Sequence, residues 1–235
     1  ADAGQHRLND CALALIERHR VSHSQWVPTM FIRLLKLPEE VRTGYDVSSL
    51  RNMIHGAAPC PQEIKRTMIE WWGDTIQEYY AATEGGGTVI TAAQWMERPG
   101  SVGTAWPGSE LRIYDDEGTQ LGAGQIGTVY MQLMADFEYK GDSAKTKANR
   151  IENFFTVGDL GELDEDGYLF LRDRKADMII SGGANIYPAE IEGELINHPA
   201  VQDVAVFGIP NADWGEGAAA WAMNFSPEAI RSGIE

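Results

Sequence analysis

Apolar and polar residues follow two spacings along the first hundred residues, one typical of helices and one typical of strands. Leu13 and Ile16 fall on one face of a helix. Pro28 and Pro61 stand where helices can begin, because proline is tolerated at a first helical position. The expected helices cover residues 10–20, 28–36 and 61–72, and the expected strands cover residues 21–27, 50–54 and 75–83. Alternation of strand and helix predicts a parallel sheet with covered faces.

The spacing changes near Pro99, after which short alternating runs are broken by the turn sequences DDEG, GAG and DEDG. These features predict strands joined by tight turns, with no helix in residues 100–132. A strand, a Gly-Gly loop and a helix beginning at Pro188 are expected after Arg174. We therefore expect an α/β fold with a β-barrel-like subdomain. Its expected parts are an α/β part at 1–98, a β-rich part at 99–172, a connection at 173–177 and the start of a small α+β domain at 178–235.

The composition of the chain limits which binding partners and which cellular compartment are expected. The chain has 19 basic and 35 acidic side chains and a net charge of -16, so it repels polyanions, and we expect no nucleic-acid partner. No apolar run approaches the roughly 20 residues that span a bilayer, and we expect no transmembrane segment. Cys11 and Cys60 lack the spacing of a metal site, so both are expected to be small buried residues in a reducing, cytoplasmic compartment.

One short motif is rejected because of its context. Residues 122–127, GAGQIG, match the dinucleotide pattern G-x-G-x-x-G, which requires a strand before it and a helix after it. Here a turn precedes the motif and the strand-like sequence TVYMQL follows it. The Walker pattern, H-E-x-x-H, G-x-S-x-G and paired C-x-x-C do not occur in the sequence, which excludes the commonest P-loop, zinc and serine-hydrolase interpretations.

Two loops of small residues lie at the predicted carboxyl ends of strands, where α/β proteins bind ligands. They contain HGAAP, residues 55–59, and AATEGGG, residues 81–87. In the second loop Glu84 precedes three glycines, which let a bulky ligand approach the main chain. The carboxylate is either an ordinary turn residue or a ligand of a metal ion.

Five stretches, taken in order, resemble the adenylate-forming superfamily, and in particular its acyl-CoA synthetase branch. They are VSHSQWVPTMFIRLLKLP, HGAAP, YYAATE, TVGDLGELDEDGYLFLRDRKADMIISGGANIYPAEIE and HPAVQDVAVFGIP. The resemblance covers nearly the whole chain. It implies a ligase that uses ATP, Mg²⁺ and coenzyme A: a carboxylate attacks the α-phosphorus of ATP and pyrophosphate leaves. The thiol of coenzyme A then displaces AMP from the acyl adenylate.

The resemblance also implies roles for single residues. Tyr80 would stack on adenine, Thr83 would hydrogen-bond the α-phosphate and Glu84 would bind Mg²⁺. Asp159 would accept hydrogen bonds from the ribose hydroxyls, and Arg174 would donate hydrogen bonds to them. Backbone groups would line the base and the pantetheine tunnel, at Gly56, Ala57 and Ala58 for the base and at Gly182 and Gly183 for the tunnel.

His23 bears on the choice of substrate. The resemblance implies that it lies near the substrate carboxylate or at the acyl pocket, while the alternative is an ordinary, partly buried loop histidine. Peptide-synthetase adenylation domains usually have an Asp near this point to pair with an ammonium group. An imidazole therefore favours an acid without an amino group. A fatty acid and an aryl acid of the benzoate or coumarate type both stay open.

The chain departs from the family pattern at three points. The phosphate loop is expected upstream of residue 1 and the lysine of the adenylation step beyond residue 235, and Ala176 stands where the interdomain hinge is usually Lys or Asp. Transition-state charge in phosphoryl transfer is stabilised mainly by positioned groups, so we expect this chain alone to form no adenylate at a useful rate. The alternatives are a non-catalytic nucleotide-binding module and an α/β protein unrelated to nucleotides.

Overall fold

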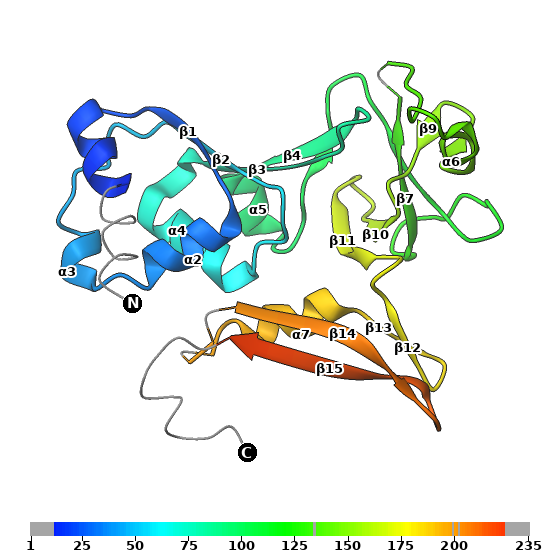
Figure 1. The fold of residues 1–235 in the computed structure, drawn as a ribbon. Coiled ribbons are helices and arrows are strands. Elements are labelled where there is room, and N and C mark those ends of the chain that lie inside the picture. The colour runs from blue at the N-terminus through cyan, green and yellow to red at the C-terminus, as the bar shows by residue number, and fades with distance from the viewer. Residues whose placement is uncertain (1–11, 134, 199, 202, 224–235) are drawn as a thin grey trace. The chain divides into compact units, whose positions relative to one another are not determined.

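The structure is a computed structural model that describes residues 12–133, 135–198, 200–201 and 203–223 (Figure 1). The chain divides into two compact units, residues 1–109 and residues 110–235. The sequence predicted a first boundary at residue 98, whereas the structure divides the chain after residue 109. The expected connection at residues 173–177 lies inside the second unit.

The first unit is built on a five-stranded sheet in the order β1-β2-β3-β4-β5. The strands are β1 (His23–Trp26), β2 (Asn52–His55), β3 (Ile76–Ala81), β4 (Gly87–Thr91) and β5 (Thr104–Ala105). The first three strands are parallel, as the alternation predicted, whereas β4 and β5 add antiparallel to them. The sheet is therefore mixed, with three adjacent carboxyl ends at one edge.

Helices of the first unit begin and end at residues with clear local reasons. They are residues 12–19, α2 (Pro28–Leu35), α3 (Glu39–Arg42), α4 (Gln62–Trp72), the 3₁₀ helix η1 (Gly73–Thr75) and α5 (Ala92–Glu97). Pro28 occupies the first turn of α2, as expected. Thr91 and Gln94 form a reciprocal capping box that starts α5, because each side chain bonds the backbone N–H of the other residue.

One face of this sheet holds the core of the first unit, and α2 and α4 pack against it (Figure 1). Trp26, Phe31 and Trp72 form an aromatic cluster with ring centroids 5.3 to 6.1 Å apart. Met53 and Ile76 are fully buried on the same side. Side chains of the opposite face, including Gln25 and Tyr79, are only partly buried or exposed. Alternation along each strand thus separates a packed face from an accessible one.

The second unit begins with a six-stranded antiparallel sheet. Its strands are β6 (Leu111–Tyr114), β7 (Gly127–Gln132), β8 (Arg150–Ile151), β9 (Phe154–Phe155), β10 (Asp159–Leu163) and β11 (Leu169–Arg174). β7 pairs with β6 along one edge and with β10 and then β9 along the other. Tyr114, Tyr130 and Phe154 form a buried aromatic cluster on this sheet.

After β11, the described residues of the second unit form a four-stranded antiparallel sheet, in the order β13-β12-β15-β14, and a helix that follows β13. These elements are β12 (Ile179–Ser181), β13 (Ala184–Ile186), α7 (Pro188–Leu195), β14 (Asp203–Asn211) and β15 (Gly215–Met223). Pro188 begins α7, as predicted. The mixed helix-and-sheet class expected from the sequence is confirmed.

Three expectations can be compared directly with the elements. GAGQIG lies between β6 and β7 and leads into a strand, so rejecting it as a dinucleotide motif is confirmed. Residues 100–132, where strands without a helix were expected, indeed contain no helix. The short helix α6 (Ser143–Ala148) follows them and was not expected; Asp142 caps it by accepting a hydrogen bond from Lys145 N at 2.9 Å. Cys60 is partly rather than fully buried, and Cys11 lies outside the described residues.

Within the residues that the structure describes, every helix is too short or too polar to cross a lipid bilayer.

Candidate functional site

The two loops predicted to bind a nucleotide lie side by side in the first unit. β2 and β3 are parallel neighbours, so the loops that follow them leave the same edge of the sheet. Gly56, at the end of β2, touches Tyr79 of β3: a Cβ added to Gly56 would lie 2.6 Å from the Tyr79 carbonyl oxygen and 2.8 Å from its ring. Only glycine fits at this contact, which sets the spacing of the two loops.

The loop after β2 exposes small residues. Ala57 and Ala58 are both exposed, and Ala57 has φ of +70°. A residue with a Cβ is uncommon in this left-handed region and costs on the order of 1–3 kcal/mol there, so the surrounding structure must hold it. Ala57 and Ala58 are therefore accessible, and Ala57 is held in an unusual backbone conformation.

The loop after β3 is a tight turn that presents Thr83 and Glu84. Gly85 and Gly86 have φ of +113° and +77°, and Gly85 N donates to the Ala82 carbonyl at 3.1 Å. Thr83 Oγ1 is exposed and donates to Glu84 Oε2 at 3.1 Å, while Glu84 is partly buried. A hydroxyl and a carboxylate thus lie together at the strand end, and Tyr80, partly buried, stands at the end of β3 itself.

The third glycine of the run acts differently from the first two. A Cβ at Gly87 would lie 2.6 Å from the Tyr80 carbonyl oxygen and 2.8 Å from the Trp106 ring. Gly87 therefore packs β4 against β3 and the indole. Two of the three glycines shape the turn, and the third permits close packing.

A cavity of about 320 Å³ opens on the accessible face of the same sheet. Its lining residues come from four neighbouring strands and the segment after β5: Gln25, Ile54, Tyr79, Val89 and Trp106. Gln25 Nε2 donates to Tyr79 Oη at 2.8 Å, and Trp106 Nε1 donates to the Thr88 carbonyl at 3.2 Å. The lining is mostly apolar or aromatic, as in sites for small organic molecules.

Sequence reasoning missed these five lining residues. The signal that points to three of them is the two-residue period of β1, β2 and β3, which puts Gln25, Ile54 and Tyr79 on the face opposite the buried residues. His23 lies on this same face of β1, since it is two residues before Gln25. It stands at the start of β1, opposite Asn52, and its Nδ1 lies 2.9 Å from Ser22 Oγ. His23 is thus exposed and away from the strand-end loops.

In the second unit the structure brings Asp159 and Arg174 together. They are Cα partners in the β10–β11 ladder, and Arg174 Nε lies 3.6 Å from Asp159 Oδ1. The arginine side chain is 73% exposed and the aspartate side chain 14% exposed. Tyr80 and Glu84 belong to the first unit, so the prediction that all four residues surround one nucleotide stays a prediction.

Gly182 and Gly183 form the turn between β12 and β13, and both are exposed. Gly182 N donates to the Trp214 carbonyl at 2.8 Å, and a Cβ at Gly182 would lie 2.5 Å from the Trp214 ring. Ala176 is exposed in the turn between β11 and β12, where Asp177 N donates to the Arg174 carbonyl. The roles in a pantetheine tunnel and in a hinge stay predictions.

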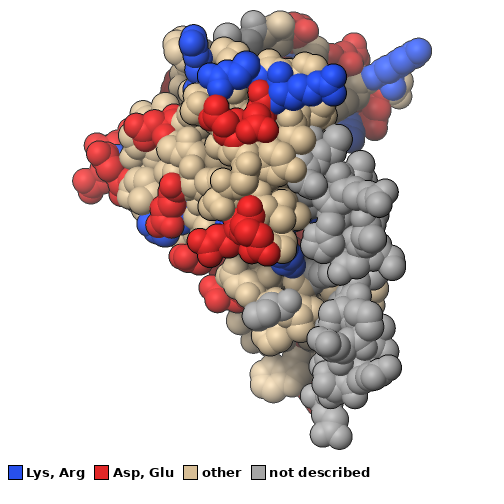
Figure 2. All heavy atoms as spheres, turned by 90° about the vertical axis from the view of Figure 1, so that its left-hand side faces the viewer, with Lys and Arg blue, Asp and Glu red and all other residues tan. Residues whose placement is uncertain are grey.

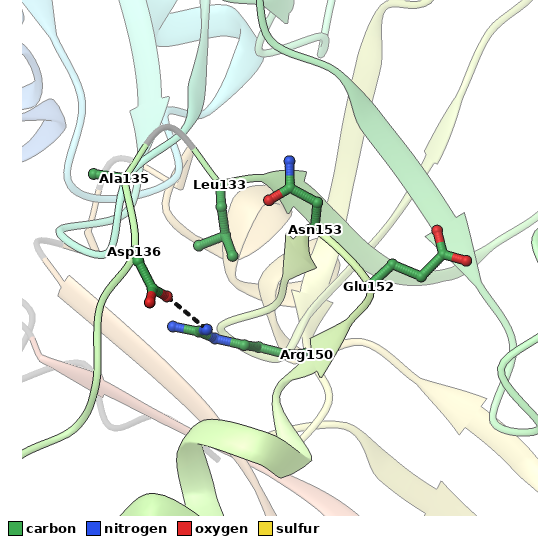
Figure 3. A pocket seen from close by; sticks show the side chains of 6 residues that line it. All are labelled: Leu133, Ala135, Asp136, Arg150, Glu152 and Asn153. Atoms are coloured by element: carbon green, nitrogen blue, oxygen red, sulfur yellow. Dashed lines mark hydrogen bonds and ion pairs between the residues drawn. The ribbon is translucent and has the colours of Figure 1, made fainter.

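A second cavity, of about 340 Å³, lies in the second unit and contains none of the predicted site residues (Figure 3). Asp136 and Arg150 are its charged pair, with Arg150 Nη1 2.8 Å from Asp136 Oδ1. Arg150 also donates to the Phe137 carbonyl and lies 4.7 Å from the centre of the Phe137 ring. Because the guanidinium has partners within the protein, this cavity is a weaker candidate for a phosphate ligand than the loops of the first unit.

On the face drawn in Figure 2, acidic and basic side chains lie next to one another in places, and uncharged surface separates other charged side chains. Among the described residues, no three His, Cys, Asp or Glu side chains gather into a metal site. Glu84 stays the predicted ligand of Mg²⁺, a cation that is commonly held by one or two protein carboxylates and by phosphate oxygens of the substrate.

Comparisons with known proteins place the chain in a family. The family model described as "AMP-binding enzyme" matches residues 2–133, and the one described as "AMP-binding enzyme C-terminal domain" matches residues 190–231. A long-chain-fatty-acid–CoA ligase of Bacillus subtilis is 34% identical over 218 residues, which are 90% of this chain and 38% of the ligase. A 2-succinylbenzoate–CoA ligase of Bacillus pumilus is 37% identical over 91% of this chain and 43% of the ligase.

Solved structures are also similar. An amide bond synthetase from Marinactinospora thermotolerans has a TM-score of 0.82 and 31% identity, over 95% of this chain and 47% of that one. An o-succinylbenzoate CoA synthetase of Bacillus subtilis, bound to its acyl-adenylate intermediate, has a TM-score of 0.77 and 29% identity, over 93% and 44% of the two chains. The chain thus spans less than half of the length of these relatives and structures.

Proposed function

Because the chain belongs to the AMP-binding enzyme family, we propose that it is part of an AMP-forming acyl-CoA synthetase that acts on an apolar carboxylic acid. In the proposed reaction the acid's carboxylate attacks the α-phosphorus of ATP, and pyrophosphate leaves. The thiol of coenzyme A then attacks the acyl carbonyl, and AMP leaves. The observation that supports the proposal best is the contact between Gly56 and Tyr79, which brings together the two loops that the sequence predicts to bind a nucleotide.

Each loop would serve the nucleotide in a different way. The main chain at residues 56–58, exposed at Ala57 and Ala58, would lie along the adenine, and Tyr80 would stack on the base. Thr83 Oγ1 would donate to the α-phosphate, and Glu84 would hold Mg²⁺, which supplies positive charge to the phosphates. Asp159 would accept hydrogen bonds from the ribose hydroxyls, and Arg174 would donate to them.

The acid would occupy the cavity on the accessible face of the sheet. Its volume, about 320 Å³, suits a small acyl group, and Ile54 and Val89 supply apolar lining. His23 would stand near this cavity, because it shares a face of β1 with Gln25. Gly182 and Gly183 would border the path of coenzyme A.

One observation favours an aryl acid as a second candidate. Tyr79 and Trp106 give the cavity two aromatic walls, and flat rings pack favourably on such walls. The relatives include a ligase named for a fatty acid and one named for succinylbenzoate. An aryl-CoA ligase of the benzoate or coumarate type is therefore the alternative within the class, and a nucleotide-binding module without turnover is the alternative outside it.

The test is calorimetry on the 235-residue chain with AMP and with non-hydrolysable acyl-adenosine mimics in which a sulfamoyl group replaces the phosphate. We expect the mimics to bind more tightly than AMP, because they also fill the cavity. An octanoyl mimic that binds more tightly than a benzoyl mimic supports a fatty acid, and the reverse order supports an aryl acid. The absence of binding by AMP and by every mimic would contradict the proposed function.

A further inference from the structure

A buried ion pair lies directly beneath the two strand-end loops. Lys65 of α4 places Nζ 2.5 Å from Oε2 of Glu78 in β3, and the two side chains are 1% and 8% exposed. Nζ also lies 4.8 Å from the centre of the Trp95 ring. Replacing such a pair with apolar residues of similar volume is often neutral or stabilising, so stability alone does not explain why the core contains it.

His55 of β2 is the third member of this group. It is fully buried and is the register partner of Glu78 in the parallel ladder, with Nδ1 4.0 Å from Glu78 Oε1. Its ring meets the edge of Phe31 at 5.2 Å between centroids, and no described residue hydrogen-bonds either ring nitrogen. Buried polar atoms without a partner are rare, so their presence calls for an explanation.

The pKa shifts of His55, Lys65 and Glu78 all reflect burial away from water. Burial, with a smaller contribution from nearby Lys65, lowers the pKa of His55 to about 3, so the imidazole is neutral. Burial lowers the pKa of Lys65 and raises that of Glu78, while their mutual attraction opposes both shifts. The three side chains therefore occupy a low-dielectric interior, where contacts are strong and positions are well defined.

These three residues connect α4, β2 and β3 next to the proposed site. His55 immediately precedes Gly56 and the strained Ala57, and Glu78 stands two residues before Tyr80. A residue held in an unfavourable conformation needs surroundings that fix it. Lys65 links α4 to β3, because its ammonium group donates a hydrogen bond to the Glu78 carboxylate.

We propose that His55, Lys65 and Glu78 are positioning residues that hold the 56–58 loop and Tyr80 in their nucleotide-binding arrangement. Their loss weakens nucleotide binding more than it weakens the fold. This inference rests on the proposed function, since it assigns the network to the same nucleotide site.

The test uses the 235-residue chain with Lys65→Met and Glu78→Leu together, which removes both charges and keeps the volumes similar. We expect the midpoint of thermal unfolding to stay at or above that of the wild type, while the dissociation constant for AMP rises about tenfold, the effect of a modest misplacement of binding groups. Lys65→Gln with Glu78→Gln keeps a hydrogen bond between the two sites, and we expect it to restore binding to within about threefold of the wild type.

A matched control lies on the same helix. Glu63 pairs with Arg66 on α4, with Arg66 Nε and Glu63 Oε1 3.8 Å apart, and the Glu63 side chain is 69% exposed, so Glu63→Gln should leave AMP binding unchanged. If the Lys65–Glu78 double variant does not fold, His55→Leu replaces it. This change removes two unpartnered nitrogens from the core, so we expect a higher midpoint of unfolding together with weaker AMP binding.

The outcomes separate the inference from the proposed function. A folded Lys65–Glu78 double variant, or a folded His55→Leu variant, that binds AMP as the wild type does overturns the positioning role. A wild-type chain that binds neither AMP nor the acyl-adenosine mimics overturns the proposed function itself.

Discussion

Asp159 and Arg174 are direct partners across the β10–β11 ladder, with Arg174 Nε 3.6 Å from Asp159 Oδ1. The arginine is 73% exposed, so water screens the pair. Exposed ion pairs contribute only about 0–1 kcal/mol to stability. The pair is therefore a poor explanation for the stability of the sheet and a good candidate for binding hydroxyl groups, because it offers acceptors and donors at one point.

Replacing the aspartate should affect binding and not folding. We expect Asp159→Asn to weaken AMP binding by about tenfold or more, since a hydrogen bond to a charged group contributes about 1.5–3 kcal/mol. The free energy of unfolding should change by less than about 1 kcal/mol. Calorimetry and urea denaturation measure the two effects. Asp136→Asn is the control, since Asp136 is an exposed partner of Arg150 in the same unit and should leave AMP binding unchanged.

Gly56 should tolerate no larger residue. In Gly56→Ala the new Cβ meets the Tyr79 carbonyl oxygen at 2.6 Å, so the two loops must separate. We expect a loss of about 1–3 kcal/mol in the free energy of unfolding, measured by urea denaturation, and weaker AMP binding. Gly193→Ala is the contrasting change, since no atom lies within 4 Å of its Cβ inside α7, and it should stabilise by up to about 1 kcal/mol. If Gly56→Ala and Gly193→Ala change the free energy of unfolding equally, the close contact with Tyr79 is not the reason why glycine is required at position 56.

Local signals in the sequence predicted the elements that carry the site. Pro28 and Pro188 begin α2 and α7 as expected, because the fixed φ of proline suits a first turn. The strand-helix alternation predicted the parallel β1–β3 arrangement, and with it the common edge where the residue 56–58 and 82–86 loops emerge. These features depend on near neighbours in the chain, so one sequence is enough to find them.

Contacts that depend on strand register could not be predicted from the sequence. Gln25 and Tyr79 are 54 positions apart, and their hydrogen bond exists because β1 and β3 flank β2 in one register. The contact between Lys65 and Glu78 likewise depends on how α4 packs on the sheet. The short helix α6 was missed because its cap, Asp142, sits within a polar stretch that has no apolar helical face. Tertiary packing decides such features, and composition gives little signal for them.

His55 should make the fold sensitive to acid. The unfolded chain takes up a proton on this histidine below about pH 6.5, whereas the folded protein resists it until about pH 3. Between these two pKa values the unfolded state binds more protons than the folded state does. The contribution of His55 to the free energy of unfolding is therefore highest above pH 6.5 and decreases as the pH falls toward 3. Relative to His55→Leu, the wild type should lose about 2–3 kcal/mol in the free energy of unfolding by pH 4.5, measured by urea denaturation. Glu78, which faces His55, is present in both proteins. A difference between the two proteins that does not change with pH would disprove this role of burial.

Cys60 should be a slow nucleophile in the folded protein. Burial raises the pKa of its thiol, with the Glu78 carboxylate adding to the shift, so little thiolate exists near neutral pH. In a Cys11→Ser background, alkylation by iodoacetamide at pH 7.5 should be at least about tenfold slower for the folded protein than for the urea-unfolded protein. Mass spectrometry follows the modification. Glutathione, labelled in the same mixture, shows whether the reagent is active. Equal rates in the folded and unfolded states would mean that the thiol is not protected.

Glu84 should couple magnesium to the phosphates of ATP. Its carboxylate lies beside Thr83 Oγ1 at the turn after β3, and Mg²⁺ prefers such an oxygen together with phosphate oxygens. We expect EDTA to weaken ATP binding to the wild type by about tenfold and to weaken binding to Glu84→Gln much less, because the variant has already lost the metal ligand. AMP binding, measured by the same calorimetry, should change little, since AMP lacks the β- and γ-phosphates. Glu97→Gln, an exposed carboxylate in the same unit, should keep the wild-type response to EDTA. If EDTA weakens ATP binding to Glu84→Gln as much as it weakens binding to the wild type, the Glu84 carboxylate does not hold the metal.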